Sequence, residues 1–338
     1  MSQLPAFNNP AELEVFVAEH DVIATEHGRW VDLTEVGPIM CGWLIEDKYD
    51  YNPDPKVISL TTAIGPTILA VFKERYHKLA LRDVTDMADA RIGTEVHAGI
   101  AASIPRIAPV LEEERLTAPL GNGFSLSGQA DAFMPLWYAL GMTSGNDHVW
   151  VNSDHKNTSV YKLIKRDFKD YDWQINGGAL LVHLVLGPPY RVVRGEINAI
   201  LKDWSFRKAA HEQDYPKAKI VKIPIDTIRP MEEIQEYFVG RTNAIAKART
   251  LKDSELKPCT PEERWEKDTE WAVKKRGAKT ARAGLGKLFK PSRGETFEDA
   301  MEYHKKVGTD KYDLETRPGE RTRCDHFCAY RAWCPLYR

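Results

Sequence analysis

The chain has 338 residues, of which 43% are hydrophobic and 28% charged, and its formal net charge is -2. This is long enough for one large or two ordinary folded domains, and the near-neutral charge argues against a protein that coats nucleic acid over its whole surface. No run of about eighteen apolar residues is present to span a bilayer, and the N-terminus lacks the regions of a signal peptide, so we expect a cytoplasmic protein without a membrane segment.

The first part of the chain predicts mainly helices. Residues 1–56 have the composition of an N-terminal appendage, with a short helix near 11–20 and then Gly and Pro punctuation. Apolar residues at helical spacing predict a helix behind Pro66 and a second helix over 87–103.

Strand patterns follow in the middle of the chain. The alternation over 115–136, interrupted by Gly-Asn-Gly, predicts a hairpin, and 147–156 predict a further strand. Thr158 or Ser159 then caps a predicted helix. Its apolar stripe is Tyr161, Ile164, Phe168 and Tyr171, and the basic residues flanking the stripe are Lys162, Lys165, Arg166 and Lys169.

The remaining elements complete the predicted fold class. Strand patterns over 190–201 and 218–225 precede a long helical pattern over 231–249. This order predicts an α/β (α+β) protein in which a central mixed β-sheet is flanked by helices. We expect its core over 57–250, with a C-terminal segment over 251–338 packed on that core.

Four short motifs hold the polar residues best suited to catalysis. They are, in chain order, Gly93-Thr-Glu-Val-His97, Gly128-Gln-Ala-Asp131, Asp154-His155-Lys156 and Gln174. Taken singly, a hydrogen-bonded histidine, a turn-capping aspartate and an exposed charged turn are their ordinary explanations. Gly93 shares a helix face with His97, so we expect it to leave room there for another backbone or a substrate.

Asp154 and Lys156 are the most informative pair. They are two residues apart at the end of a predicted strand, so both side chains project to the same side of the sheet. With a second acid on a neighbouring strand they would form a small hydrolytic site. Two carboxylates are suitable ligands for Mg²⁺, and a lysine can orient the attacking water and stabilise charge on a phosphate.

In this order the motifs resemble the PD-(D/E)XK nuclease superfamily, in particular its RecB-like exonuclease branch, over roughly 57–185. The stretches that carry the resemblance are "GTEVH", "SGQAD", "SDHK" and "WQINGGALL". The resemblance implies a restriction-endonuclease-like core. It also implies that Asp131 and Asp154 bind Mg²⁺ or Mn²⁺, with the backbone carbonyl of His155 and the side chain of His97 as further ligands.

By the same resemblance, Lys156 is the catalytic lysine. Gln174 corresponds to the Gln-x-x-x-Tyr element of the family, which helps to hold DNA and the catalytic lysine. The sequence departs from that element, because Gly178 stands where the tyrosine would be.

Four of the five cysteines have a metal-site spacing. Cys259 is followed after sixty-four residues by Cys324, and then Cys328 and Cys334 follow at gaps of three and five residues. Four thiolates can hold a tetrahedral zinc ion or a 4Fe-4S cluster, and spacing alone does not separate the two.

This cysteine pattern is similar to the iron-sulfur clasp of the AddB nuclease and of CRISPR-associated exonucleases of the RecB type. "PCTPEERW" and the cysteine-rich C-terminus also resemble phage-encoded relatives, and this resemblance implies that Cys259 is the fourth ligand of the cluster. The arrangement in AddB would instead imply that Cys41 is the fourth ligand. An iron-sulfur cluster is the interpretation we favour, with zinc or unligated thiols as alternatives.

A basic stretch lies between the outer cysteines. Residues 274–293 contain eight Lys and Arg residues and no acid. A solvated loop is the ordinary explanation, but a stretch held between the cysteines could also bind DNA beside the active site. The residues we assign to DNA binding here are Lys274, Lys275, Arg276, Lys279 and Arg282, in addition to the four basic residues behind Ser159.

Together these patterns predict a metal-dependent DNA nuclease that is stabilised by a 4Fe-4S cluster, and the resemblance favours exonuclease action. The resemblance implies a role in phage DNA recombination or replication in the host cytoplasm, with DNA and a phage recombination or single-strand-binding protein as partners. The alternatives are a catalytically silent nucleic-acid-binding module of the same fold, and a zinc-stapled enzyme, including a zinc-stapled endonuclease. Exonuclease or endonuclease action, strand preference and oligomeric state stay open.

Overall fold

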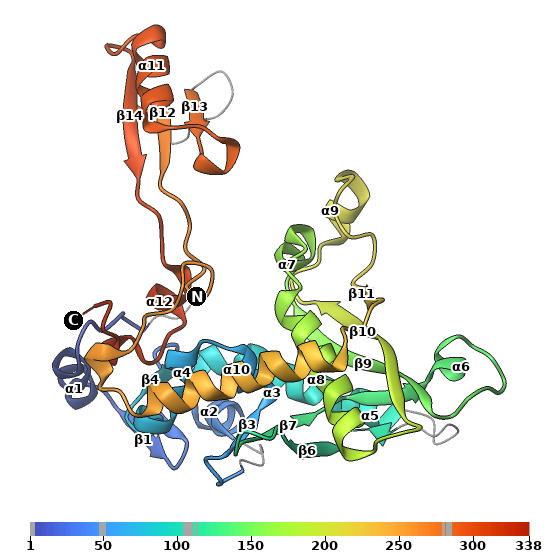
Figure 1. Cartoon of the computed structure of the whole chain (residues 1–338). Helices are drawn as coiled ribbons and strands as arrows, with labels where there is room; N and C mark the ends of the chain where they lie inside the picture. The colour runs from blue at the N-terminus through green and yellow to red at the C-terminus, as the bar shows by residue number, and fades with distance from the viewer. Residues whose placement is uncertain are drawn as a thin grey trace. The chain divides into compact units, whose positions relative to one another are not determined.

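The computed structural model describes residues 4–46, 52–103, 111–112, 114–278, 281 and 286–337 (Figure 1). Its contacts divide the chain into two compact units. The larger unit is His20–Leu256, and the smaller unit joins Met1–Glu19 to Lys257–Arg338. The N-terminal segment that we expected to be a single appendage is thus shared between the two units.

A five-stranded sheet is the centre of the larger unit, with the strand order β11-β10-β9-β8-β5. The bounds are β5 (Leu111–Glu112), β8 (Ala132–Pro135), β9 (Val149–Thr158), β10 (Arg191–Leu201) and β11 (Ile220–Ile225). β9 and β10 are parallel, whereas the other neighbours are antiparallel. The sheet is therefore mixed, and helices flank it, which confirms the predicted fold class.

Helix α8 (Lys169–Val185) packs closely against this sheet. The approach depends on a glycine of β10. A Cβ at Gly195 would lie 2.2 Å from Ile175 Cγ2 of the helix. Gly195 pairs with Asn152 of β9, so this close approach also brings α8 near the strand that carries Asp154 and Lys156.

Two smaller sheets and the remaining helices complete the larger unit. The first sheet has the order β1-β2-β4, with β1 (Val22–Thr25), β2 (Gly28–Val31) and β4 (Leu81–Asp83). The second has the order β3-β7-β6, with β3 (Val57–Ser59), β6 (Arg115–Pro119) and β7 (Ser125–Gln129). The helices are α2 (Pro38–Ile45), α3 (Leu60–Ile64), α4 (Thr67–Tyr76), α5 (Ala88–Ser103), α6 (Leu136–Ala139), α7 (Val160–Lys165), α9 (Phe206–His211) and α10 (Met231–Arg249).

The predicted single helix behind Ser159 is wrong, because the chain forms two helices there. α7 ends at Lys165, and the next residue, Arg166, adopts a left-handed conformation with φ of 53°; α8 then begins at Lys169. The predicted apolar stripe is divided accordingly. Tyr161 and Ile164 are exposed on α7, whereas Tyr171 is buried on α8.

The smaller unit contains a three-stranded sheet with its own core. The sheet has the order β13-β12-β14, with β12 (Glu270–Lys275), β13 (Gly286–Phe289) and β14 (Tyr312–Arg317), and α11 (Phe297–Val307) packs on it. Val273, Phe289 and Ala300 are its buried residues. Helix α1 (Pro10–Glu19) belongs to the same unit, in which Arg331 donates a hydrogen bond of 2.8 Å to Asn8 Oδ1.

The described part of the chain contains no helix that is both long and apolar enough to cross a membrane.

Candidate active site

Strand β9 carries the two residues at the centre of the site. Asp154 and Lys156 alternate with His155, so they share one face of the strand. Lys156 Nζ lies 2.6 Å from Asp154 Oδ2, and the Asp154 side chain is 3% exposed. The neighbouring residues of β10 are Ile197 and Ala199, so the adjacent strand presents no competing charge beside the pair. The structure thus brings together the predicted acid and lysine as an ion pair in which Asp154 is buried and Lys156 is partly exposed.

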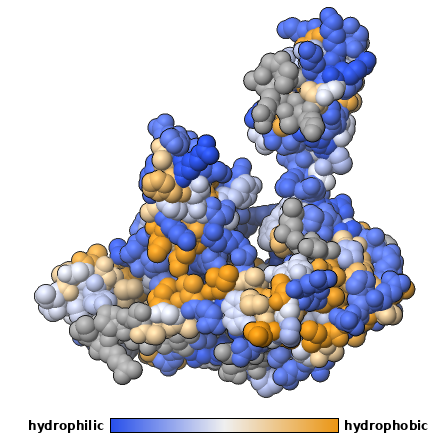
Figure 2. Space-filling model, turned by 180° about the vertical axis from the view of Figure 1, so that it is seen from behind, coloured by the Kyte–Doolittle hydropathy of each residue, from blue (hydrophilic) through white to orange (hydrophobic). Residues whose placement is uncertain are grey.

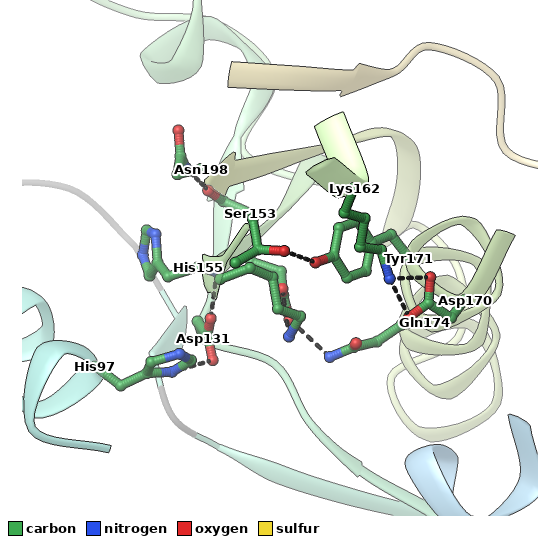
Figure 3. Close-up of polar contacts among 12 residues, drawn as sticks. His97, Asp131, Ser153, His155, Lys162, Asp170, Tyr171, Gln174 and Asn198 are labelled. Atoms are coloured by element: carbon green, nitrogen blue, oxygen red, sulfur yellow. Dashed lines mark hydrogen bonds and ion pairs between the residues drawn. The ribbon is translucent and has the colours of Figure 1, made fainter. Parts of the chain in front are cut away.

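Asp131 lies between β7 and β8 and joins the pair to α5. Its Oδ1 is 3.1 Å from Nδ1 of His97, and its Oδ2 accepts a hydrogen bond from the backbone N–H of His155. Figure 3 shows His97 reaching Asp131 from α5, while the backbone of β9 holds the other carboxylate oxygen. Both interactions orient Asp131, and they place His97, Asp131 and β9 in one constellation.

Gln174 reaches the site from α8, on the other side of the constellation (Figure 3). Its Nε2 donates a hydrogen bond of 2.7 Å to Asp154 Oδ1. The bond fixes the orientation of the carboxylate. Gln174 is therefore a direct partner of Asp154 in this structure, although its family motif is incomplete.

The departure at Gly178 has a steric explanation. A Cβ at Gly178 would lie 2.4 Å from Nδ2 of Asn152, a residue two positions before Asp154 on β9. Asn152 uses that nitrogen to donate a hydrogen bond of 3.1 Å to the carbonyl of Ile175. The Asn152 side chain thus occupies the space directly against α8, where no side chain at 178 fits.

Burial and neighbouring charges set the acidity of the two carboxyl groups in opposite directions. Burial raises the pKa of Asp154 to about 6, against the opposing effect of the Lys156 ammonium, and the nearby Asp131 charge also raises it. Burial acts the same way on Asp131. The hydrogen bond from His97 and the His155 N–H outweigh it, so the pKa of Asp131 is lowered. The two acids are therefore chemically distinct.

The two histidines also differ. The hydrogen bond to Asp131 raises the pKa of His97 above its usual value. Burial lowers the pKa of His155, whose ring lies 6.2 Å from that of His97 between centroids. A charged His97 would therefore be stabilised by Asp131, whereas His155 favours the neutral imidazole.

A small pocket opens beside the pair, with room for about one water molecule. Its polar lining includes Asn152, Asp154 and Gln174, and Gly178 forms part of the wall. Asn152 Oδ1 is buried without a hydrogen-bond partner, whereas Asp154 Oδ2 is buried with the Lys156 ammonium as its ion-pair partner. A buried oxygen without a partner, such as Asn152 Oδ1, needs water or a cation.

The donor set suits a divalent cation of the Mg²⁺ type. Asp131 and Asp154 supply carboxylate oxygens, and such ions are commonly bound by one or two carboxylates and several waters. In the described part of the chain, no three His, Cys, Asp or Glu side chains already surround one point as metal ligands. Two carboxylates completed by water fit the observed residues, whereas a ligand shell made only of side chains does not.

Sequence analysis missed a polar network on the opposite face of β9. Ser153 donates a hydrogen bond of 3.2 Å to the buried Glu196 of β10 and accepts one of 2.9 Å from Asn198. Lys222 of β11 lies 2.8 Å from the other oxygen of Glu196. The alternation of Glu196 and Asn198 with apolar residues in the second half of β10 is the signal that would have revealed it.

The four predicted cluster cysteines all belong to the smaller unit. Burial raises the pKa of Cys259 to about 12 and that of Cys328 to about 11, and neighbouring cysteines add to both effects. Cys324, in α12 (Thr322–His326), contributes to the shifts of Cys259, Cys328 and Cys334. The four thiols therefore interact electrostatically, and each described cysteine is free of disulfide bonds.

Cys41, the alternative fourth ligand, has another environment. It lies in the larger unit, in a core cluster with Trp30, Leu44 and Val84. Its thiol donates a hydrogen bond of 3.3 Å to Asp32. Packing and this hydrogen bond give Cys41 a structural explanation of its own.

The predicted DNA-binding residues are not equally available. Lys162 forms an ion pair with Asp170 at 2.7 Å and lies 4.0 Å from the centre of the Tyr171 ring. Lys165, Arg166 and Lys169 are exposed. α7 thus presents basic groups at the surface, with Lys162 tied to its neighbours.

Much of the charge of the basic stretch is balanced by its own sheet. Lys274 pairs with Glu315, and Arg276 lies 3.2 Å from Asp313. Lys275 is exposed, while Lys279 and Arg282 fall outside the described residues. These ion pairs within the β12–β14 sheet explain why the charge of the described basic residues is less available than the sequence suggested.

Comparisons with known proteins give little further guidance. No family model matches the chain, and no curated protein matches it by sequence. The solved structure of a protein named SSO0001 is 14% identical, covers 61% of this chain and 84% of its own, and has a TM-score of 0.41. An alkaline exonuclease (LHK-Exo) from Laribacter hongkongensis is 11% identical, covers 57% of this chain and 91% of its own, and has a TM-score of 0.30. At these scores neither likeness carries an argument about function.

Proposed function

We propose that this protein is a metal-dependent DNA nuclease of the PD-(D/E)XK type. The observation that carries the proposal is the ion pair between the buried Asp154 and the partly exposed Lys156, with Asp131 bonded to the same strand and Gln174 bonded to Asp154. A buried charged acid is unfavourable for folding unless it is paired, and such residues cluster at functional sites.

The roles follow from what each group can do. Asp131 and Asp154 are the carboxylates that would hold Mg²⁺ or Mn²⁺, together with the His155 carbonyl and waters. When bound, such an ion supplies positive charge to the scissile phosphate and lowers the pKa of coordinated water. His97 contacts Asp131 through Nδ1, which leaves Nε2 as the ring nitrogen that can bind a metal ion.

The protein's own groups position the reaction. Lys156 lies where its ammonium can orient the attacking water and stabilise negative charge on the phosphate oxygens during hydrolysis. Gln174 holds Oδ1 of Asp154 in place, so the carboxylate presents its other oxygen to the site. We infer hydrolysis of a phosphodiester bond as the reaction. Digestion from DNA ends, as in the RecB-like branch, is the finer form of the proposal.

The decisive test is digestion of end-labelled linear DNA with Mg²⁺ or Mn²⁺, compared with the same DNA in EDTA. Asp154→Asn and Lys156→Ala should each lower the rate at least about 100-fold, since loss of one well-placed charge-stabilising group has effects of that order. Asp147→Asn, at an exposed acid just before β9, is the matched control and should retain full activity. Full activity of Asp154→Asn and Lys156→Ala would refute the assignment, whereas metal-independent DNA binding without digestion would favour the silent binding module. Circular DNA in parallel separates exonuclease from endonuclease action.

We further propose that Cys259, Cys324, Cys328 and Cys334 hold a 4Fe-4S cluster as a structural clasp. The support is that the Cys324 thiol contributes to the raised pKa of each of the other three thiols, Cys259, Cys328 and Cys334, which come from both ends of the segment 259–334. A cluster attaches each cysteine to a different iron, so its ligands need not surround one point as they would for zinc. Protein purified without oxygen should be brown and contain iron and sulfide. Colourless protein with stoichiometric zinc would overturn the iron-sulfur assignment and leave the nuclease proposal standing.

We also propose that the biological role of the protein is in phage DNA recombination or replication. Its support is the resemblance of the cysteine-rich C-terminus to phage-encoded relatives. Co-purification with a recombination or single-strand-binding protein from infected cells would test it.

A further inference from the structure

The connection between β10 and β11 is much longer than its geometry requires. β10 ends at Leu201 and β11 begins at Ile220, so the connection has 18 residues, although the two strands are antiparallel neighbours. Such strands need only two to five residues to join them. Longer ordered connections commonly have a function of their own.

This connection folds together with α7 into one lobe. Val160 and Leu163 of α7 share a hydrophobic cluster with Trp204, Ala209 and Tyr215 of the connection. The backbone N–H of Val160 also donates a hydrogen bond of 2.7 Å to Asp203 Oδ1. We name residues 159–168 and 202–220 the α7–α9 lobe.

The lobe exposes aromatic side chains that its own core does not use. Phe206 is 77% exposed and Tyr161 is 67% exposed, while Trp204 and Tyr215 supply the buried contacts. The exposed apolar side chains Ile164 and Ile220 lie on the same lobe. Seen from behind in Figure 2, the projecting lobe on the left carries hydrophobic surface beside strongly hydrophilic surface.

Basic side chains lie beside the rings of the lobe. Lys165 Nζ lies 5.8 Å from the centre of the exposed Tyr161 ring, and Lys208, which is exposed, lies with its Nζ 5.8 Å from the centre of the buried Tyr215 ring. Further exposed cations are Arg166, Arg207 and Lys219. Exposed rings among cations are the surface that single-stranded nucleic acid binds, because bases stack on the rings and phosphates meet the charges.

The lobe lies next to the candidate active site along the chain. β9 and β10 are parallel, so their C-terminal ends lie at the same end of the sheet, and both strands lead directly into the lobe. Val160 follows Lys156 by four residues, which is about 13 Å of extended chain. A strand bound at Lys156 can therefore continue onto the lobe without a gap of more than a few nucleotides.

We propose that the α7–α9 lobe binds single-stranded DNA, with Tyr161 and Phe206 stacking on unpaired bases and the basic residues contacting the backbone. The proposal rests on the proposed function for the identity of the nucleic acid, and it specifies the substrate as DNA with unpaired bases next to the cleaved bond. Duplex DNA hides its base faces, so the aromatic residues should not contribute to binding a blunt duplex.

The test measures binding rather than cleavage, so it is independent of catalysis. Fluorescence anisotropy in EDTA would compare labelled oligothymidylate with a blunt duplex for the wild type, Tyr161→Ala, Phe206→Ala and the double variant. Each single substitution should weaken oligothymidylate binding by about 5- to 100-fold and change duplex binding little. Phe206→Trp should retain binding, and Ile39→Ala, at another highly exposed apolar residue, should have no effect.

Three results would overturn the proposal. Unchanged oligothymidylate affinity of the double variant would show that the rings do not bind bases. An equal loss on single-stranded and duplex DNA would show that the lobe recognises the backbone alone. Loss of self-association or of a protein partner, with DNA binding intact, would show that the lobe binds protein. If the variants lose oligothymidylate binding but no variant or wild type cleaves DNA, the proposed function fails while the lobe proposal stands.

Discussion

Asn152 and Gly178 share one space between β9 and α8, and each determines which residue the other position can hold. An alanine Cβ at Gly178 would lie 2.4 Å from Asn152 Nδ2. Asn152 cannot easily move away, because it is buried and bonded to the carbonyl of Ile175. Gly178→Ala should therefore lower the free energy of unfolding by about 1 to 3 kcal/mol.

A double-mutant cycle in urea tests the cause of that loss. Asn152→Ala removes the obstructing side chain, so Gly178→Ala should be much less destabilising in the Asn152→Ala background. Independent, additive effects of the two substitutions would show that the two residues are not sterically coupled.

The raised pKa of Asp154 predicts how the stability of the metal-free protein depends on pH. Burial raises its folded-state pKa to about 6, above the value of about 3.9 expected in the unfolded chain. The folded state therefore binds this proton more tightly, and ionisation of Asp154 destabilises it. The penalty is absent below the unfolded pKa, grows as pH rises between the two pKa values, and is complete above about pH 6.

Asp154→Asn removes this penalty. With divalent cations chelated, the stability of the variant relative to the wild type should be greater at pH 8 than at pH 5, by about 1 to 2 kcal/mol. Urea unfolding at both pH values measures the difference, and the comparison between pH values cancels the constant effect of leaving Lys156 without its partner. A relative stability that is the same at both pH values would contradict a raised pKa.

Spacing on a strand was enough to predict part of the site. Asp154 and Lys156 share a face because strand residues alternate, and the structure places them in contact. Their partners could not be placed in this way. The bond between His97 and Asp131 joins an exposed helix to a turn 34 residues away, and no local pattern encodes that distance.

Gly93 shows the same limit. We expected it to allow another backbone to approach α5, but a Cβ there would meet no atom within 4 Å. The space beside Gly93 is open in the described structure, so no other backbone approaches α5 at this position.

At the scale of elements, the break between α7 and α8 has a measurable signature. Arg166 adopts the left-handed conformation with φ of 53°, in which a Cβ is unfavourable by about 1 to 2 kcal/mol. Arg166→Gly should therefore raise the free energy of unfolding by about 0.5 to 1 kcal/mol and raise the melting temperature in a thermal unfolding experiment.

The same substitution removes an exposed cation of the α7–α9 lobe, so it should weaken binding to DNA even though the protein is more stable. Arg166→Asn, which tolerates the left-handed conformation and also lacks the charge, should behave alike. A gain in stability without a loss of affinity would exclude Arg166 from the DNA-binding surface.

The sequence patterns predicted most of the long elements and failed at this break. The helices predicted over 87–103 and 231–249 correspond to α5 and α10. The strands predicted over 190–201 and 218–225 correspond to β10 and β11. The apolar residues of 159–171 keep helical spacing across Arg166, so periodicity does not detect a residue that leaves the helical conformation. Glycine would have marked the position, but arginine occupies it.

At the scale of the whole molecule, the proposed iron-sulfur clasp should stabilise only the smaller of the two units. The four cysteines lie in the unit of 1–19 and 257–338, and Cys41 lies in the other. Cys259→Ser should release most of the iron and increase amide hydrogen exchange in the smaller unit, while residues 20–256 keep their protection.

Cys41→Ala is the matched control, because it removes a buried thiol from the larger unit. It should retain the iron while lowering the stability of the larger unit. The reverse outcome, with iron lost from the Cys41 variant and kept in the Cys259 variant, would identify Cys41 as the fourth ligand.

Local sequence patterns could not predict which segments of the chain pack together to form each unit. Residues 1–19 pack with the C-terminal segment, and the contact between Asn8 and Arg331 spans 323 positions. Helix α1 itself was predictable from its composition, but its partner was not, because apolar periodicity identifies a buried face without identifying what covers it.

That contact also sets an order of events during synthesis. Helix α1 is made before residues 20–256, yet Arg331 is added 323 residues after Asn8, which takes roughly 15 to 65 s at ordinary rates of translation. During this interval residues 20–256, a continuous segment, can fold on the ribosome. Helix α1 therefore reaches its final packing only after the chain as far as Arg331 has been made.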